Sequence, residues 1–306
     1  MSSASSAKRL TIAVVGLGSI GGVTTACLAA ARRHEVSACV RQPIATLTLE
    51  RGDEAIGVAV RVLTDPVAAS PVDWVLLCTK TPATASTAPW LQRLCTPATK
   101  VAVLQNGIDH AVRVAPLTGG ASVIPVIVYY NAERLAPDRV RLRQVGDDDF
   151  VVADDAVGRA FAQLFDGTPW RVRLSEDFTT LLWRKLLMNA TANPISALTL
   201  QRQAVFRRAD VQALSLAVLA EAIAVGRAEG ARLASDEAQR IMTQVLGYSP
   251  ELGTSMYFDR LAGRPLEVDA LTGAIVAAGE RHGIPTPLNR ALLTLLRAVS
   301  DAATEK

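Results

Sequence analysis

The chain has 306 residues, of which 50% are apolar and 20% are charged, as in a globular protein of one large or two ordinary domains. Its 32 basic and 29 acidic residues leave a formal net charge of +3, which argues against nucleic acid and against a membrane surface as partners. Lysine is scarce among the basic residues: only Lys8, Lys80, Lys100, Lys185 and Lys306 are present. Because the pKa of lysine can shift toward neutral pH whereas arginine stays charged, an interior lysine is a candidate proton donor.

The cysteines and the uncharged segment near the N-terminus restrict the class of protein further. The four cysteines form no CxxC pair, so we expect reduced thiols, no disulfide framework and no metal site: Cys27, Cys39, Cys78 and Cys95. Residues 11–31 carry no charge, as in a signal peptide or a membrane span, but glycines cluster in the middle of the segment. We therefore predict a strand, a turn and a helix there, and a cytoplasmic protein.

Strand-length apolar runs alternate with helical patterns over the first 175 residues. Strand Leu10–Val15, a glycine-rich turn, helix Val23–Arg32 and strand Glu35–Val40 form one βαβ unit. A helical piece is expected around 84–94, and further strands are expected at 58–63, 74–78, 101–104, 122–130, 140–144, 150–152 and 170–172. This order predicts a mostly parallel, doubly wound α/β sheet with an antiparallel addition.

Helical patterns dominate the rest of the chain, where strand-length β-branched runs nearly disappear. Helices are predicted at 177–190, 209–229, 235–245, 265–281 and 288–302. The predicted fold is thus a Rossmann-type, doubly wound α/β domain, residues 1–175, followed by an all-α domain, residues 176–306.

A glycine-rich turn follows the first predicted strand and reads GxGxxG. In such a turn the first glycine permits the tight bend, the second lets the backbone approach a pyrophosphate, and the third lets helix and strand pack closely. A plain glycine-rich turn is the alternative, but the position inside a βαβ unit favours a dinucleotide. The predicted cofactor-binding residues of the turn are Gly16, Leu17, Gly18, Ser19, Ile20 and Gly21.

Arg41 lies at the end of the second predicted strand, about 20 residues after the last glycine of the turn. An NAD site has an acidic residue there for the ribose 2′-hydroxyl, whereas a cation suits the 2′-phosphate of NADP. The nearest acids, Glu50 and Asp53, lie too far along the chain to replace the missing one. NADP is therefore the predicted cofactor, with a solvated surface arginine as the alternative reading.

Two further strand ends carry polar residues. Lys80 follows the strand at 74–78, and Asn106 with Gly107 follows the strand at 101–104. Ligands of parallel sheets bind outside the carboxyl ends of the strands, so both side chains are candidates for the cofactor side. An exposed loop lysine and a simple Asn-Gly turn are the alternatives.

The segment 182–194 holds Lys185, Asn189 and Asn193, three polar residues at spacings of four. On a helix that persists to Pro194 they form one polar stripe bordered by apolar residues, which suits the wall of a binding site. A surface lysine and a helix cap are the alternatives. Glu267 follows Pro265 and reads, from the residues alone, as an acid in the first turn of a helix.

The motifs together resemble those of the ketopantoate reductase (2-dehydropantoate 2-reductase) family over nearly the whole chain. The matching residues and segments occur in the family's order and spacing: GLGSIGG, Arg41, CTK, QNG, LWRKLLMNATANPISALT, TSM, GRPLEVDALTG and HGIPTP. The resemblance implies an oxidoreductase of pantothenate biosynthesis that uses NADPH to reduce a 2-keto acid to a 2-hydroxy acid. The reaction that it implies first is the conversion of 2-dehydropantoate to pantoate. A homodimer is the oligomeric state expected from the resemblance.

The same resemblance implies roles for individual residues. Lys185 donates a proton to the carbonyl oxygen, and Glu267 holds the substrate hydroxyl or the lysine. Asn106, Asn189 and Asn193 position the substrate, and Ser255 meets its carboxylate. The cofactor side is implied to involve Arg41, Lys80, Asn106 and Ala132, the last on a loop after the strand at 122–130.

The chain departs from the family pattern shortly before Ser255. The family often has an asparagine there, whereas this chain has Leu252 and Gly253. Loss of an amide removes a hydrogen bond to a substrate hydroxyl, so a more apolar 2-keto acid is an alternative substrate. A β-hydroxyacid or opine-type dehydrogenase and a non-catalytic NADP-binding regulator are the alternative functions.

Overall fold

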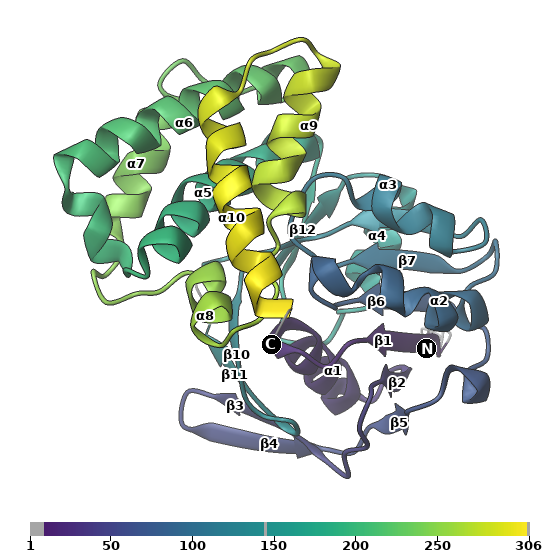
Figure 1. Ribbon diagram of the computed structural model, residues 1–306. Coiled ribbons are helices and arrows are strands. Elements are labelled where there is room, and N and C mark those ends of the chain that lie inside the picture. The colour runs from purple at the N-terminus through teal and green to yellow at the C-terminus, as the bar shows by residue number, and fades with distance from the viewer. Residues whose placement is uncertain (1–8, 144–145, 305–306) are drawn as a thin grey trace, which may run out of the picture. The chain divides into compact units, whose positions relative to one another are not determined.

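The computed structural model describes residues 9–143 and 146–304 (Figure 1). They form two compact units. The first contains the chain up to Gln105 and residues His110–Glu176, and the second contains Asn106–Asp109 and the chain from Asp177 onward. The sequence placed the division one residue earlier, after residue 175, and did not separate Asn106–Asp109 from the first domain.

A six-stranded parallel sheet forms the centre of the first unit, in the order β5-β2-β1-β6-β7-β8. Strand β1 lies inside the apolar run that predicted it, and it is buried along nearly its whole length. The strand order reverses between β2 and β6 on either side of β1, the place where such sheets bind dinucleotides. The bounds are β1 (Thr11–Val15), β2 (Glu35–Cys39), β5 (Arg61–Leu63), β6 (Trp74–Leu77), β7 (Lys100–Val103) and β8 (Ser122–Pro125).

Helix α1 (Ser19–Ala31) packs on the central sheet and also on a second sheet of order β10-β11-β3-β4 (Figure 1). This mixed sheet is the antiparallel addition, and it is larger than the sequence indicated. The prediction of one strand at 58–63 was wrong, because Val58 ends one strand and Arg61 begins another. The strands of the second sheet are β3 (Leu47–Arg51), β4 (Glu54–Val58), β10 (Asn131–Ala136) and β11 (Arg139–Arg143); the predicted strand 140–144 ends at Gln144, outside the described residues.

The predicted strand at 122–130 is two strands in different sheets. β8 ends at Pro125 in the central sheet, and β9 (Ile127–Val128) pairs with β12 (Phe150–Ala153) in a third sheet. The chain leaves the central sheet just after this proline, since Val126 N still donates a hydrogen bond to the carbonyl oxygen of Val103 on β7. β12 also pairs in parallel with β13 (Val172–Ser175), which begins where the predicted strand 170–172 ends.

Four α-helices lie in the described residues of the first unit, together with short 3₁₀ turns. Helix α1 begins at Ser19, immediately after Gly18, rather than at Val23. Helix α4 (Ala156–Gln163) was missed, although Asp155 caps it by accepting hydrogen bonds from two of its first N–H groups. The other two helices are α2 (Ala88–Leu94), within the segment predicted as helical, and α3 (His110–Val114).

All four cysteines are free thiols in this unit. Burial raises the pKa of Cys27 and of Cys39 to about 12 and that of Cys95 to about 11, and it raises the pKa of Cys78 further. Thiols with such pKa values stay protonated near neutral pH and behave as small apolar side chains.

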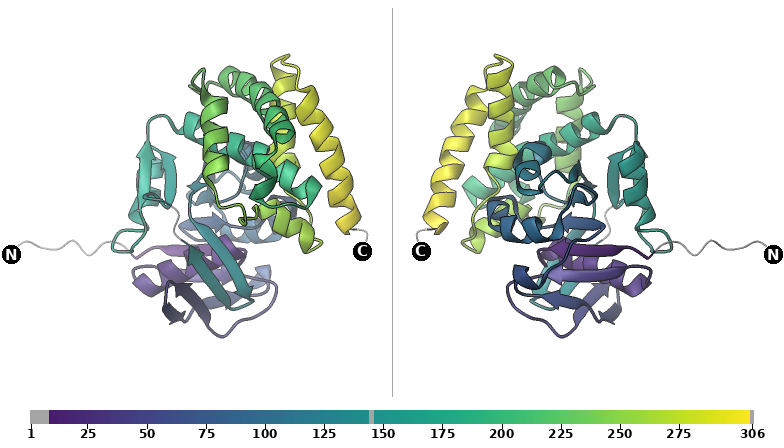
Figure 2. Two further views of the ribbon diagram at one scale, coloured as in Figure 1. Left: turned by 90° about the vertical axis from the view of Figure 1, so that its left-hand side faces the viewer. Right: turned by 90° about the vertical axis from the view of Figure 1, so that its right-hand side faces the viewer.

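Helices make up the regular structure of the described residues from 177 onward, and both views of Figure 2 show the green-to-yellow part of the chain as helices. Helix α5 packs against α6, α7, α8 and α10. It runs on to Thr199 with Pro194 inside it, so the predicted end at residue 190 was wrong. The helices are α5 (Phe178–Thr199), α6 (Ala209–Ala228), α7 (Glu237–Gly247), α8 (Ser255–Leu261), α9 (Ala274–Arg281) and α10 (Pro287–Thr304).

Helix α6 is the one helix of the described residues that is long and apolar enough to cross a membrane. In this unit it contacts α5, α7, α9 and α10. Its buried residues, which include Val218, Leu219 and Ile223, belong to the core between those helices. Part of the apolar surface of α6 is therefore packed inside the helical unit.

Candidate active site

The glycine-rich turn joins β1 to α1, and close packing accounts for three of its glycines. Gly16 has a φ of +98°, and a Cβ there would lie 2.7 Å from Thr79 Cγ2. A Cβ on Gly21 would overlap the carbonyl oxygen of Gly16. A Cβ on Gly22 would lie 2.6 Å from Val140 Cγ1, so this glycine lets β11 approach α1.

Gly18 differs from these three glycines, because a Cβ at this position would meet no atom within 4 Å. Its φ of −72° is also accessible to other residues, so the described protein atoms do not require a glycine here. Gly18 is the N-cap of α1, and no side chain caps this helix start. The open space and the N–H groups of the first helical turn fit a pyrophosphate, which approaches the backbone at this glycine of the motif.

Arg41 lies two residues beyond β2, on the exposed surface of the first unit. Among the described residues it has no hydrogen bond or ion pair. Glu50, the first acid after it, is engaged on β3 by Arg141, with a nitrogen–oxygen distance of 2.7 Å. The end of β2 therefore offers a guanidinium and no carboxylate to a ribose, an arrangement that suits a 2′-phosphate.

The two other predicted cofactor residues of this unit lie on different elements. Lys80 follows β6 and begins a short 3₁₀ turn, Thr81–Ala83. Ala132 lies in strand β10, so its placement on a loop was wrong; the chain turns directly from Tyr130 into this strand. The Tyr130 hydroxyl donates a hydrogen bond to the carbonyl oxygen of Ile20 at 3.1 Å, which joins the start of β10 to the first turn of α1.

In the second unit, Lys185, Asn189 and Asn193 lie on one continuous helix, α5, at spacings of four residues. The condition for the predicted stripe is therefore met. Asn189 is half-buried, whereas Asn193 is only 3% exposed. The Nδ2 of Asn193 has no hydrogen-bond partner among the described residues, so a buried donor is available to a ligand.

Lys185 is partly buried, and its surroundings make it a better acid than an ordinary lysine. Burial lowers the pKa of Lys185 to about 8 from the usual 10.5, although the charge of Glu267 raises it. A group with this pKa is charged at neutral pH and gives up its proton readily just above it.

Glu267 is 4% exposed, and a buried carboxylate needs partners. Asn106 supplies one, since its Nδ2 donates a hydrogen bond to Glu267 Oε2 at 3.0 Å. The expectation that Glu267 sits in a first helical turn was wrong. It precedes a π-helical turn, Asp269–Gly273, and its carbonyl oxygen accepts a hydrogen bond from Leu271 N.

Ser255 is exposed at the first position of α8, a helix that was not predicted. Thr254 is the N-cap and accepts a hydrogen bond from Tyr257 N at 3.1 Å. The Thr254 hydroxyl lies 2.7 Å from Ser196 Oγ on α5, one turn beyond Asn193. Threonine is a favoured N-cap residue, so Thr254 was the signal in the sequence from which this helix start could have been predicted.

The described residues provide no group of three or more His, Cys, Asp and Glu side chains that could hold a metal ion. A proton donor, a buried carboxylate and several amides are instead the groups that the site offers. Such a set can bind a polar substrate and protonate an oxygen on which negative charge develops.

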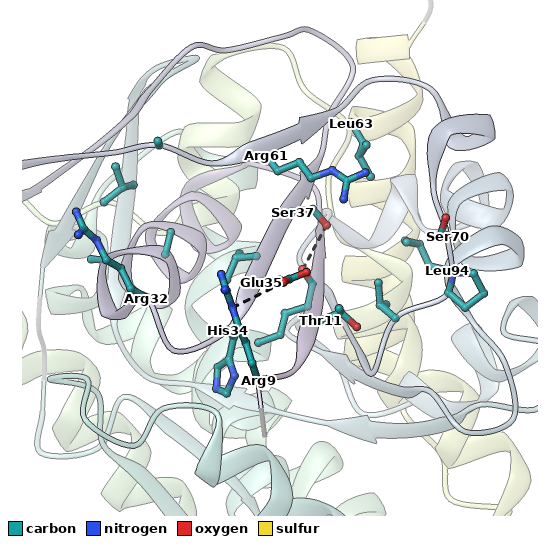
Figure 3. Close-up of a pocket in the computed structure, with 18 of the residues that line it drawn as sticks. Arg9, Thr11, Arg32, His34, Glu35, Ser37, Arg61, Leu63, Ser70 and Leu94 are labelled. Carbon is teal, nitrogen blue, oxygen red and sulfur yellow. Dashed lines mark hydrogen bonds and ion pairs between the residues drawn. The ribbon is translucent and has the colours of Figure 1, made fainter. Parts of the chain in front are cut away.

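A separate cavity of about 680 Å³ lies at the amino ends of β1 and β2 (Figure 3). Thr11, Glu35 and Ser37 line it, together with Arg9 and Arg61. None of the predicted site residues lines this cavity. The cavity therefore lies at the amino ends of the strands, whereas dinucleotides bind at their carboxyl ends, where the glycine-rich turn is.

Comparisons with known proteins bear on both units. Residues 12–154 match the family model "Ketopantoate reductase PanE/ApbA", and residues 177–300 match "Ketopantoate reductase PanE/ApbA C terminal". The chain is 41% identical to the 2-dehydropantoate 2-reductase of Mycobacterium tuberculosis, covering 95% of this chain and 98% of the relative. It is 39% identical to that of Caulobacter vibrioides, covering 94% of this chain and 99% of the relative.

A solved structure, the dimeric ketopantoate reductase of Staphylococcus aureus, has a TM-score of 0.86 to this structure with 26% identity, covering 96% of this chain and 100% of that one. The parallel sheet of the first unit and the helices of the second agree with this structural match. The chain belongs to the ketopantoate reductase family.

Proposed function

We propose that this protein reduces 2-dehydropantoate to pantoate with NADPH. The observation that carries the proposal is Lys185, whose pKa of about 8 makes it a proton donor on a helix that also carries Asn189 and Asn193. The names of the relatives from Mycobacterium tuberculosis and Caulobacter vibrioides support the same reaction.

When bound, NADPH supplies the hydride that the carbonyl carbon of the keto acid receives. The carbonyl oxygen then gains negative charge and needs a proton. Lys185 donates that proton from its ammonium, so the oxygen becomes the hydroxyl of pantoate and the lysine becomes a neutral amine. The amine regains a proton from solvent before the next turnover.

Glu267 and Asn106 assist this step from the same unit. The carboxylate keeps the lysine charged in a partly buried position, because it raises a pKa that burial lowers. The hydrogen bond from Asn106 holds one carboxylate oxygen, and the carboxylate contacts the substrate hydroxyl or the lysine in this proposal.

Asn189, Asn193 and Ser255 hold the substrate in this proposal. The buried Nδ2 of Asn193 gains an acceptor when the keto acid binds. The exposed hydroxyl of Ser255, at the start of α8, receives the carboxylate.

The cofactor side consists of the glycine-rich turn from Gly16 to Gly21 with Arg41, Lys80, Asn106 and Ala132. The space at Gly18 receives the pyrophosphate, and Arg41 pairs with the 2′-phosphate. NADP is favoured over NAD because Arg41 is exposed, whereas Glu50 is committed to Arg141.

The setting of the reaction is part of the proposal. We place the enzyme in the cytoplasm and in pantothenate biosynthesis, with a small keto acid as its partner and with neither nucleic acid nor a membrane. The dimeric Staphylococcus aureus relative supports a homodimer.

A specific observation favours a related keto acid as the second candidate substrate. Leu252 presents an exposed apolar side chain, 39% accessible, three residues before Ser255. An apolar group at this position favours a substrate that lacks the hydroxyl of ketopantoate.

The experiment is a steady-state assay of NADPH oxidation by the full chain with ketopantoate and a panel of other 2-keto acids, with pantoate identified among the products. We expect the highest kcat/KM with ketopantoate. Background turnover with ketopantoate, together with reduction of a hydroxyl-free keto acid, would replace the substrate by the second candidate. Background turnover with every keto acid would reject the reductase.

A further inference from the structure

Gln105 is a buried amide, 7% exposed, that the proposed reaction does not use. It follows the carboxyl end of β7 and reaches across to the residues that follow β6, the neighbouring strand. Its Nε2 lies 2.9 Å from the carbonyl oxygen of Thr79, 3.1 Å from Thr79 Oγ1 and 3.0 Å from Thr84 Oγ1. One side chain therefore fixes both the backbone and the side chain of Thr79.

The amide group is itself held at its other end. Its Oε1 accepts a hydrogen bond from Arg113 on α3 at 3.3 Å. The backbone carbonyl oxygen of Gln105 lies 2.8 Å from Nε2 of the buried His110, so the main chain at this residue is held as well. An amide oriented by several partners has little rotational freedom, so its donor side points steadily at Thr79.

Thr79 in turn forms the wall of the glycine-rich turn. A Cβ on Gly16 would lie 2.7 Å from Thr79 Cγ2 and 3.1 Å from the backbone nitrogen of Thr79, which is too close for any side chain. A shift of Thr79 would therefore push on Gly16, the residue at which the chain bends between β1 and α1. Thr79 also directly precedes Lys80, so the hydrogen bond from Gln105 to the Thr79 carbonyl oxygen fixes the position of the Lys80 backbone.

We propose that Gln105 is a positioning residue for the dinucleotide: by fixing Thr79 it sets the shape of the turn at Gly16 and the start of the Lys80 segment. The inference deepens the proposed function and depends on NADPH binding at that turn. Gln105 acts through Thr79, so its removal should weaken the cofactor and leave the proton transfer at Lys185 intact.

The chemistry of the amide distinguishes this role from a simple tie between loops. Only the NH₂ side of Gln105 can donate to the Thr79 carbonyl, while the oxygen side serves Arg113. Gln105→Glu keeps an acceptor for Arg113 but places a carboxylate oxygen against a carbonyl oxygen. Gln105→Met keeps the length of the side chain and removes both interactions.

A matched control lies at the other end of the same strand. Thr99 immediately precedes β7, is 1% exposed, and donates a hydrogen bond to the carbonyl oxygen of Val72 at 2.8 Å. Thr99→Val removes a buried hydrogen bond of similar cost to stability at the amino end of β7. It leaves the residues around Gly16 unchanged.

The test measures the Kd of NADPH by equilibrium titration without keto acid, and then KM and kcat. We expect Gln105→Glu and Gln105→Met each to weaken NADPH by about 10-fold, in Kd and in KM, with kcat and the KM of the keto acid within about twofold of the parent. Thr99→Val should lower the unfolding temperature without changing the Kd of NADPH.

An unchanged Kd in Gln105→Met would overturn the inference, as would an equal change in Thr99→Val. Weakening in Gln105→Met but not in Gln105→Glu would also overturn it, because Arg113 would then be the partner that matters. If both variants fail to fold, Thr79→Ser tests the same claim by removing only the methyl group against Gly16; it should also weaken NADPH, and an unchanged Kd would reject the role.

Because binding is measured without substrate, the result is separable from the proposed reaction. A parent protein that binds NADPH but reduces no keto acid would refute the proposed function and still leave the Kd comparison readable.

Discussion

The side-chain amide of Asn106 donates a hydrogen bond to the buried carboxylate of Glu267, with 3.0 Å between Nδ2 and Oε2, although 161 positions separate the two residues. The bond joins the short segment Asn106–Asp109 to the helical unit that contains Lys185. It gives the carboxylate a fixed neutral partner. The charge of Glu267 in turn raises the pKa of Lys185, which burial lowers.

The open space at Gly18 predicts that cofactor binding and folding respond differently to an added methyl group. Gly18→Ala should change the free energy of unfolding by no more than about 1 kcal/mol and weaken NADPH by roughly 10-fold or more. Gly21→Ala is the matched control, because its Cβ overlaps the Gly16 carbonyl; it should cost about 2 kcal/mol of stability or more. Chemical denaturation and NADPH titration measure the two effects. Full NADPH affinity in Gly18→Ala would remove this glycine from the pyrophosphate site.

The pKa of Lys185 predicts opposite pH dependences for the two directions of the reaction. Keto acid reduction needs the ammonium, so its kcat/KM should fall as the pH rises through about 8, tenfold per unit beyond it. Pantoate oxidation with NADP⁺ needs the neutral amine, so its kcat/KM should rise through the same pH. Profiles between pH 6 and about 10 in both directions measure this. A reduction profile that is flat up to pH 9.5 would show that Lys185 is not the acid.

Arg41 predicts the preference between the two nicotinamide cofactors. Arg41→Ala should raise the KM of NADPH by about 10-fold and leave that of NADH within about twofold, because only NADPH has the 2′-phosphate. Arg61→Ala is the control, since this exposed arginine lies at the amino end of β5. An unchanged ratio of the two KM values in Arg41→Ala would place the 2′-phosphate elsewhere.

The cap of α8 predicts a change confined to the keto acid. Thr254→Val removes the hydrogen bonds to Ser196 and to Tyr257 N and should raise the KM of the keto acid about 5-fold or more, with the KM of NADPH unchanged. Asp155→Ala removes the cap of α4 in the first unit and should cost a similar amount, about 1 kcal/mol, without a kinetic effect. Equal KM values for the keto acid in both variants would mean that the start of α8 does not position the substrate.

Local sequence patterns predicted the elements whose signal lies within a few residues. β1 and β6 are buried apolar runs, and the α5 stripe follows from a spacing of four. Pro194 suggested a helix end, yet α5 continues, because only one backbone hydrogen bond is lost and packing against α8 and α10 supports the helix.

Other features depend on residues far apart in the chain. β3 and β11 pair in parallel although about 90 positions separate Glu50 from Arg141, and β10 is polar and largely exposed. No short window of sequence contains such a pairing. The same limit applies to the site, since neither the Asn106–Glu267 bond nor the Gln105–Thr79 contact has a local signature.

The role of Lys185 as proton donor is tested most directly by Lys185→Ala, measured with ketopantoate and NADPH beside the Kd of NADPH. The expected result is a kcat at least about 10²-fold lower, loss of the pH dependence near 8, and an unchanged Kd. Turnover within a few-fold of the parent, with the same fall above pH 8, would contradict the assignment and require another acid.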